Sequence, residues 1–314
     1  MADDVFTLAH VSDWHATSLE GARPAELATK RFWGWQSWKR KRRKRHLPRV
    51  LERILADVRA HSPDHIVVTG DLTNVALAQE FVEAARCLRS LGPPEDVTVV
   101  PGNHDAYVAI DPARGLDRWA PYLHGDPRRD AAPAGARAPR PEDFPTLRIR
   151  GRVAIVGCNT ALPTPLFMAS GELGEGQRDR LESLLVSLRE RGLVRVVALH
   201  HPPNAEQIAA RRRLRDHAQL EALLARAGAE LVVHGHRHRT WVGSLPGPQW
   251  PIPVAGVRSA SDVGLRPDRA AQYHLYRIDS SGASADRPAR IDLRIRGYDR
   301  DREAVVDRGE RRLA

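Results

Sequence analysis

Five short runs rich in Val, Ile and Leu recur along the chain, and each stops abruptly at polar residues. The runs and the polar stretches that follow them are TLAHV then SDWH, HIVV then TGD, VTVV then PGNHD, VRVVAL then HHPP, and ELVV then HGHRH. Continuous apolar runs of this length are typical of strands that are buried on both faces. The pattern therefore predicts five core strands.

Helical periodicity fills the intervals between these strands. Apolar residues recur at helical spacing within residues 47–58, 81–88, 181–188 and 220–224, and Pro48 suits the first turn of a helix. Strands that alternate with helices predict a layered α/β fold. Ligands in such folds bind beyond the carboxyl ends of the strands, so the five polar stretches are expected to converge.

The polar stretches supply carboxylates, imidazoles and one amide. The side chains expected to converge are Asp13, His15, Asp71, Asn103, His104, His200, His236 and His238. Such groups suit hard or borderline divalent cations, among them Mn, Fe and Zn. No thiolate is present among them, which excludes a structural zinc site of the cysteine type. A set of this size exceeds the needs of one tetrahedral ion and suits two ions that share a bridging carboxylate.

Five motifs in a fixed order now carry a resemblance to a known family. They are DWH (Asp13–His15), GD (Gly70–Asp71), GNHD (Gly102–Asp105), the first His of HHP (His200) and GHRH (Gly235–His238). Their order, each motif after a predicted strand, is similar to that of the calcineurin-like metallophosphoesterases over roughly residues 5–260. The resemblance implies a four-layer β-sandwich flanked by helices, with a dinuclear metal site at the C-terminal ends of the strands.

The resemblance also assigns roles to single residues. It implies that Asp13, His15 and His238 hold one divalent ion, that Asn103, His200 and His236 hold the other, and that Asp71 bridges both. His104 would protonate the leaving group, and Asp105 would orient His104. The implied reaction is hydrolysis of a phosphodiester or a phosphomonoester by a hydroxide held between two ions of Mn, Fe or Zn.

Histidines outside this set are expected to have structural roles. His201 and His234 lie beside the motifs, where packing or support of the ligands is the favoured interpretation. His10 lies within a strand run and is expected to be a buried, hydrogen-bonded core residue.

Composition fits a soluble globular protein of one large domain or two small ones: 42% of the 314 residues are hydrophobic and 28% are charged. Cys87 and Cys158 form no CxxC pair, which favours a reduced, cytoplasmic compartment. The N-terminus lacks the pattern of a signal peptide, and no apolar run reaches the ~20 residues that span a bilayer. Any membrane association is expected to be peripheral, at the inner face.

The expected organisation is a metallophosphoesterase domain over residues 1–280, followed by a C-terminal strand and a polar tail over residues 281–314. Ile291–Ile295 alternates like a strand that could complete the second sheet, and the very end is expected to be disordered. The domain carries a basic, Trp-rich insertion at about 16–46 and a Pro- and Ala-rich surface loop at about 126–145.

The segment from Lys30 to His46, here called the arm, holds nine Lys and Arg, three Trp and no acidic residue. It supplies nine of the net +10 charges, so the rest of the chain is almost neutral. Three interpretations stay open: docking to an anionic membrane, which is favoured, binding to nucleic acid, and packing of the Trp side chains against the domain. Because Lys, Arg and Trp supply no metal ligand here, the arm is expected to recruit and to take no part in catalysis.

The expected partner is a phosphate-ester substrate, and the arm favours one linked to a lipid or an envelope precursor. A phosphodiesterase of cyclic nucleotides or nucleic acids is the alternative. A non-catalytic adaptor that uses the arm to bind a partner is a second class of function, which the complete ligand set disfavours.

Overall fold

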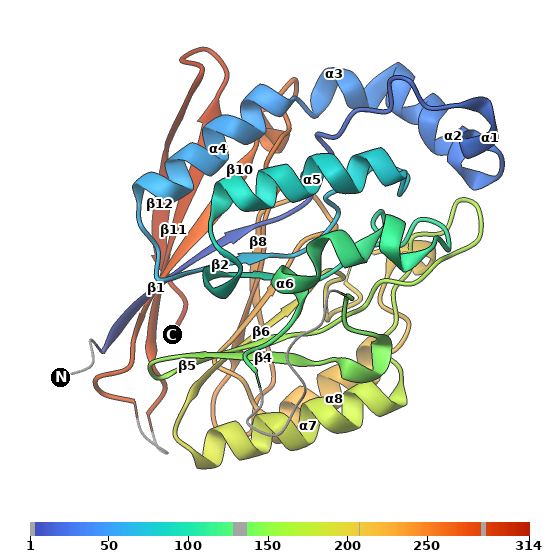
Figure 1. The fold of residues 1–314 in the computed structure, drawn as a ribbon. Helices are drawn as coiled ribbons and strands as arrows, with labels where there is room; N and C mark the ends of the chain where they lie inside the picture. Colours follow the sequence, from blue (N-terminus) through green and yellow to red (C-terminus); the bar gives the residue numbers. More distant parts are fainter. Residues whose placement is uncertain (1–3, 128–136, 207, 284–286) are drawn as a thin grey trace.

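Two six-stranded sheets pack face to face in the computed structural model, which describes residues 4–127, 137–206, 208–283 and 287–314 (Figure 1). The first sheet has the order β12 (Ala304–Arg312), β11 (Arg290–Asp299), β10 (Gln272–Asp279), β1 (Val5–Val11), β2 (His65–Val68) and β3 (Val97–Val99). The second has the order β4 (Thr146–Arg150), β5 (Val153–Gly157), β6 (Val194–Leu199), β7 (Leu231–His234), β9 (Ile252–Gly256) and β8 (Trp241–Leu245). The five predicted core strands are β1, β2, β3, β6 and β7.

The strands that carry the motifs run parallel within each sheet. β1 pairs with β2 and β2 with β3 in parallel, as do β5, β6, β7 and β9 in turn. The carboxyl ends of parallel strands meet at one edge, so the polar loops that follow them are brought together.

Helices cover the outer face of each sheet. α4 (Pro48–Ala60) and α5 (Ala78–Leu91) pack on the first sheet, while α7 (Glu175–Glu190) and α8 (His217–Ala227) pack on the second. A third apolar core, which includes Leu8, Val67, Val196 and Val233, fills the space between the sheets. The fold is therefore the predicted four-layer sandwich. No helix of the described residues is long and apolar enough to pass through a membrane.

The C-terminal segment departs from the expectation in two ways. The predicted strand at Ile291–Ile295 lies within β11 and joins the sheet of β1, on the side opposite β2, and does not extend the other sheet. The chain end is not disordered, because β12 pairs with β11 along its whole length and Leu313 donates a backbone hydrogen bond to Ile291. Most of the predicted 126–145 loop, residues 128–136, lies outside the described residues.

The arm is helical and packs on the domain beside the carboxyl edge of the sheets (Figure 1). After a short helix α1 (Pro24–Leu27), it forms α2 (Lys30–Ser37), a π-helical turn (Trp38–Arg42) and α3 (Arg43–Arg45). Trp38 is buried with Leu27, Val75 and Leu77 in a small core of its own. The packing interpretation therefore holds for Trp38, whereas Trp33 remains 53% exposed.

Candidate metal centre

Eight side chains with metal-binding chemistry meet where the carboxyl edges of the two sheets face each other. The loops after β1, β2 and β3 bring Asp13, His15, Asp71, Asn103 and His104, and the loops after β6 and β7 bring His200, His236 and His238. All are buried or half-buried. The predicted convergence is therefore present, and it joins residues as distant in the sequence as Asp13 and His236, which are 223 positions apart.

Asp13, His15 and His238 form the first ligand cluster. Oδ1 of Asp13 lies 3.1 Å from Nε2 of His238 and 3.9 Å from Nε2 of His15, and the three potential ligand atoms all lie within 4.8 Å of one another. Oδ1 of Asp13 is buried and accepts no hydrogen bond. A buried carboxylate oxygen without a donor is costly unless a cation satisfies it, so this cluster fits a metal ion.

Asn103, His200 and His236 form the second ligand cluster. Oδ1 of Asn103 lies 3.1 Å from Nε2 of His200 and 2.9 Å from Nδ1 of His236, and these two ring nitrogens are 3.3 Å apart. Three ligand atoms so close together, from three different loops, are arranged to enclose one small cation.

Asp71 lies between the two clusters. Its Oδ2 is 3.6 Å from Nε2 of His15 in the first cluster and 3.3 Å from Nε2 of His200 in the second. Its Oδ1 accepts a 2.7 Å hydrogen bond from the backbone N–H of His104. One carboxylate oxygen thus faces both clusters, which is the position that a bridging ligand requires.

Hydrogen bonds to backbone carbonyls fix the orientation of the imidazoles. Three rings direct their outer nitrogen to a carbonyl oxygen: Nδ1 of His15 to Thr73 at 2.9 Å, Nδ1 of His200 to Thr69 at 2.6 Å, and Nε2 of His236 to Arg212 at 2.8 Å. A carbonyl can only accept, so each outer nitrogen carries a proton and the inner nitrogen is the one that faces the cluster and can bind a cation. Histidines that bind metals are held in this way.

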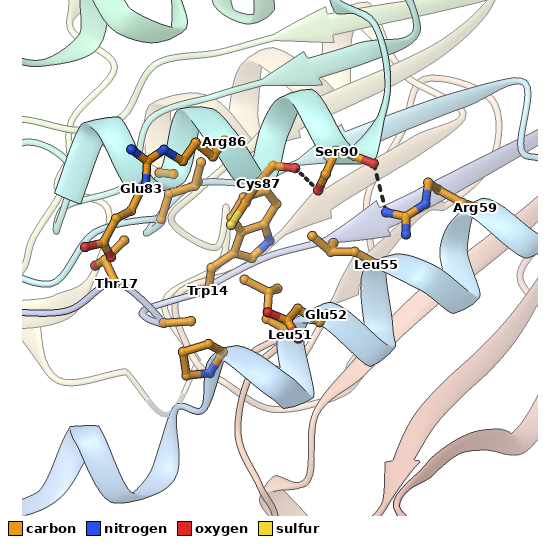
Figure 2. A pocket seen from close by; sticks show the side chains of 14 residues that line it. Trp14, Thr17, Leu51, Glu52, Leu55, Arg59, Glu83, Arg86, Cys87 and Ser90 are labelled. Carbon is orange, nitrogen blue, oxygen red and sulfur yellow. Dashed lines mark hydrogen bonds between the residues drawn. The ribbon is translucent and has the colours of Figure 1, made fainter. Parts of the chain in front are cut away.

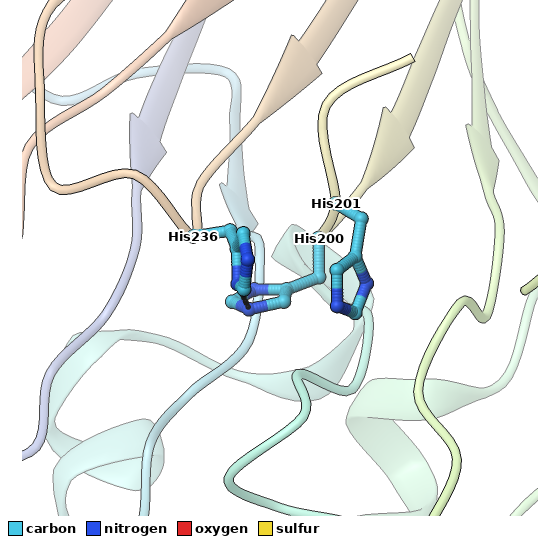
Figure 3. A group of neighbouring side chains, drawn as sticks. All are labelled: His200, His201 and His236. Atoms are coloured by element: carbon cyan, nitrogen blue, oxygen red, sulfur yellow. Dashed lines mark hydrogen bonds between the residues drawn. The ribbon is translucent and has the colours of Figure 1, made fainter. Parts of the chain in front are cut away.

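His201 is close to the second cluster but is not suited to be a ligand. His200, His201 and His236 lie side by side in Figure 3. Nε2 of His201 lies 3.3 Å from the carbonyl oxygen of Ala169, and its Nδ1 is 2.8 Å from Oγ1 of Thr160. Both ring nitrogens have partners outside the cluster, which agrees with a supporting role for this residue.

The backbone at the candidate ligands adopts conformations that side chains rarely tolerate. Positive φ angles occur at Asp13 (52°), His15 (45°), Asp71 (57°), His236 (69°) and His238 (50°). Non-glycine residues in the left-handed region are uncommon, and they concentrate at functional sites because the fold must hold them there. The strain falls on five of the seven expected ligands.

Glycines allow the loops of the two strands β2 and β3 to touch. A Cβ on Gly70 would lie 2.3 Å from the backbone N of Gly102, and a Cβ on Gly102 would lie equally close to the backbone N and Oδ1 of Asp71. The GD and GNHD motifs therefore need these glycines so that Asp71 and Asn103 can approach each other.

Burial and the carboxylate of Asp71 have opposite effects on the imidazoles of the site. Burial lowers the pKa of His15 and of His236 well below the usual value, so both rings are neutral and able to bind a cation. Burial also opposes protonation of His200, but the carboxylate of Asp71 outweighs it and raises the pKa of His200 to about 9. The site thus attracts positive charge next to Asp71.

His104 stands beside the clusters, with Nδ1 bonded to the backbone and Nε2 next to the guanidinium of Arg42. Its Nδ1 donates a 2.5 Å hydrogen bond to the carbonyl oxygen of Asn74, which leaves Nε2 without the proton. Burial, followed by the charge of Arg42, lowers the pKa of His104 to about 3. An anion bound in the site would favour the protonated ring and so raise the pKa of His104, against the effects of burial and of Arg42.

Asp105 does not orient His104 directly, which corrects that expectation. Its carboxylate accepts hydrogen bonds from the backbone N–H groups of Asp71 (2.8 Å), Leu72 (3.0 Å), Thr73 (3.0 Å) and Gly102 (2.9 Å), and from the Thr73 hydroxyl (3.1 Å). A carboxylate suits this position because it can accept on both oxygens. Asp105 therefore joins the GD loop to the GNHD loop, and the ring of His104 is oriented by Asn74.

Arg42 is the residue that the sequence analysis left out of the site. It comes from the arm, and its guanidinium group lies against the ring of His104, with Nη1 3.2 Å from Nδ1 and Nη2 3.1 Å from Nε2. Nothing in the sequence distinguishes this arginine from the others of the basic run. The arm therefore reaches the site through this side chain, which the sequence did not predict.

A separate cavity of about 510 Å³ lies between α4 and α5, away from the ligand clusters (Figure 2). Its lining is largely apolar and includes Trp14, Leu51, Leu55 and Cys87. It contains none of the candidate ligands, although Trp14 stands between Asp13 and His15 in the sequence. The candidate ligands therefore all lie outside the lining of this cavity.

Comparison with solved structures reveals the same architecture in other proteins. A dimetal phosphatase from Danio rerio has a TM-score of 0.58 at 13% sequence identity, covering 96% of this chain and 98% of that one. An NAD nucleotidase from Haemophilus influenzae has a TM-score of 0.50 at 10% identity, covering 97% of this chain and 54% of that one. This chain thus spans about half of the nucleotidase. At such identities the likeness is one of fold.

Sequence comparison identifies the family. A search of curated proteins finds no match to this chain. The sequence profile of calcineurin-like phosphoesterases, however, matches residues 6–240, which include every motif from Asp13 to His238. Because the match covers well over half of the chain and the fold agrees with it, the protein belongs to the calcineurin-like phosphoesterase family.

Proposed function

We propose that this protein hydrolyses a phosphate ester with the help of two divalent metal ions. The observation that carries the proposal is the pair of ligand clusters with Oδ2 of Asp71 between them. Asp13, His15 and His238 would hold one ion, Asn103, His200 and His236 the other, and Asp71 would bridge both. The family membership and the fold shared with a dimetal phosphatase support the assignment.

The residues around the clusters would have different roles in the hydrolysis. Two bound cations would supply Lewis acidity to a phosphoryl group and acidify a water near neutral pH. Asp71 would hold the ions at a common distance. His104, held at Nδ1 by Asn74, would carry a proton at Nε2 to the departing oxygen.

Metal-dependent turnover of a chromogenic ester tests the proposal. Protein purified without chelator should contain close to two transition-metal ions per chain. It should hydrolyse bis(p-nitrophenyl) phosphate or p-nitrophenyl phosphate, lose activity on chelation, and regain it with Mn. A preparation that remains active without metal, or one that holds two ions and hydrolyses neither ester nor any phospholipid or nucleotide ester, would contradict the proposal. The second result would favour an adaptor.

We further propose that the substrate is linked to a lipid and that the arm side of the site docks on an anionic membrane. Four exposed apolar side chains gather here, and we call them the aromatic rim: Phe32, Trp33, Leu166 and Phe167. Trp33 and Phe167, which are 53% and 73% exposed, have ring centroids 6.4 Å apart although they come from distant segments. Lys30 joins these segments through a 2.9 Å hydrogen bond to the carbonyl oxygen of Thr164.

Exposed cations follow the aromatic rim along the arm. Lys39, Arg40, Lys41, Arg43 and Lys44 are all exposed, and within the described residues none of them forms an ion pair. Aromatic side chains next to unpaired cations suit the headgroup region of an anionic bilayer, where each cation adds about 1 kcal/mol before screening. Trp38 cannot contribute, because it is buried.

Vesicle binding tests the docking proposal. Replacement of Trp33 and Phe167 by Ala should reduce sedimentation with vesicles that contain anionic phospholipid, and it should spare turnover of p-nitrophenyl esters. Leu265→Ala is the matched control, because Leu265 is 53% exposed and lies outside the rim. Replacement of Arg40, Lys41, Arg43 and Lys44 by Gln should remove the salt-dependent part of binding.

Three outcomes would contradict the docking proposal. One is equal vesicle binding by the wild type and the rim variant. The second is binding to single-stranded nucleic acid that depends on the same residues, with no binding to vesicles. The third is a clear preference of the enzyme for a cyclic nucleotide over phospholipid esters.

A further inference from the structure

Arg42 holds a positive charge at the site that no side chain neutralises. Within the described residues it forms no ion pair, in contrast to Arg45, which pairs with Asp262 at 2.5 Å. Its contact is the imidazole of His104, where two nitrogens of the guanidinium lie 3.1 and 3.2 Å from the two ring nitrogens. The side chain is largely withdrawn from solvent, and this burial lowers the pKa of Arg42.

The contact with His104 uses only part of the guanidinium. The two nitrogens of an imidazole point away from each other in the ring plane, so one guanidinium cannot meet both in that plane and must lie against the ring face. Nδ1 of His104 also donates its hydrogen bond to the carbonyl oxygen of Asn74 and cannot accept one from Arg42. Since a guanidinium offers five N–H donors, some of them stay free for an anion that enters the site.

The arm is built so that Arg42 points inward. Trp38 is buried and anchors the start of the π-helical turn that ends at Arg42. Gly34, one turn earlier, packs so closely that a Cβ would lie 2.4 Å from Cγ1 of Val75. After Arg42, His46 pairs with the Ser261 hydroxyl at 2.8 Å. The segment is therefore fixed on both sides, and π-helical turns of this kind are frequent at functional sites.

The centre toward which Arg42 points is where an anion is expected. The largest attraction that Arg42 experiences comes from the carboxylate of Asp71, the residue between the two ligand clusters. Bound cations would engage that carboxylate and weaken the largest attraction that Arg42 experiences. A partly buried cation without an ion pair is unfavourable, so the metal-loaded site favours an anionic ligand next to Arg42.

We infer that Arg42 is a catalytic residue contributed by the arm, which binds a nonbridging oxygen of the phosphoryl group while that group lies over the clusters. This inference deepens the proposed function and rests on the same site. The planar guanidinium matches a phosphoryl group through paired N–H donors, which the single ammonium of lysine cannot reproduce. The arm thus completes the phosphoryl site, and only its exposed side chains are available for docking.

Binding of inorganic phosphate to the metal-loaded protein tests the inference without turnover. Arg42→Ala should weaken phosphate binding, measured by calorimetry, by about 10- to 100-fold, the loss typical of a charge-assisted hydrogen bond. Arg42→Lys should give an intermediate affinity. Arg49→Ala is the matched control, because Arg49 is a nearby exposed arginine that lies outside the arm. It should bind phosphate like the wild type.

Metal content and rescue separate this role from a structural one. All variants should keep two ions per chain, and guanidinium ion in solution should restore part of the turnover of Arg42→Ala but none of the turnover of His104→Ala. Wild-type affinity in Arg42→Ala and Arg42→Lys, or no phosphate binding by the wild type, would overturn the inference. If the wild type binds phosphate but hydrolyses no ester, the proposed function fails. Weaker phosphate binding by Arg42→Ala would in that case still support the contact between Arg42 and phosphate.

Discussion

The backbone N–H of His104 donates a 2.7 Å hydrogen bond to Oδ1 of Asp71. The carboxylate that would bridge the metals therefore also positions the residue that would deliver the proton. Removal of Asp71 is expected to damage both functions at once, whereas removal of the His104 ring leaves this backbone contact intact.

Asp71→Ala should abolish turnover and lose at least one metal ion per chain. His104→Ala should retain both ions and lose about 10²- to 10⁴-fold in kcat, the range expected for a general acid. Elemental analysis and steady-state kinetics on the same preparations check both statements. Loss of metal from His104→Ala would show that His104 is a ligand and would refute its role as an acid.

Asp105→Asn should destabilise the folded protein and release metal. The carboxylate accepts from four backbone N–H groups, and an amide would present an NH₂ group to some of them, with a loss of about 3 kcal/mol in the free energy of unfolding. Denaturant unfolding and elemental analysis measure the two effects. Asp301→Asn, an exposed aspartate in a turn, is the control. If Asp105→Asn kept its stability and lost only turnover, a direct catalytic role would replace the structural one.

Trp38 and Trp33 should respond differently to truncation. Trp38 is 7% exposed and Trp33 is 53% exposed. Trp38→Ala should reduce the free energy of unfolding by about 3–5 kcal/mol because it opens a cavity in the arm core. Trp33→Ala should change stability by less than about 0.5 kcal/mol, as expected for a surface site. Thermal or denaturant unfolding of both variants measures the two effects. Equal losses of stability would contradict the packing in which Trp38 is buried and Trp33 is exposed.

Lys30 should make stability depend on alkaline pH. Its burial beside Thr164 lowers the pKa of Lys30 from 10.5 to about 8 in the folded protein. Between these values the unfolded chain binds more protons than the folded one, so the stability of the wild type rises as the pH rises from 8 toward 10.5. Lys30→Met lacks this contribution. Denaturant unfolding of both proteins at pH 7.5 and 9.5 should show a gain confined to the wild type, and parallel changes would argue against the shift.

The core and the candidate ligands could be predicted because the same sequence pattern, an apolar run that ends at polar residues, marks both the strand and the ligands that follow it. In TLAHVSDWH the apolar run identifies β1 and its end identifies Asp13 and His15, since charged side chains are uncommon within a strand that is buried on both faces. The same holds at His200 and His236. Periodicity likewise predicts α4, where Val50, Ile54 and Val58 lie on one buried face.

The side-chain orientations of the arm could not be predicted in the same way. Composition makes Arg40 and Arg42 equivalent, but the π-helical turn directs Arg42 to His104 and leaves Arg40 in solvent. Phe167 was missed because its partner, Trp33, is distant in sequence. The pairing of β12 with β11 was missed because charged residues on an exposed edge strand resemble a polar tail.

Both ligand clusters draw on both halves of the chain. Asp13, Asp71 and Asn103 precede residue 104, whereas His200, His236 and His238 follow residue 199. A ribosome must therefore pass β7 and the loop that carries His236 and His238 before a metal can find either full set of proposed ligands. The emerging chain would therefore acquire its ions late, and a proteolytic cut between Asn103 and His200 would divide both sets of proposed ligands between two fragments.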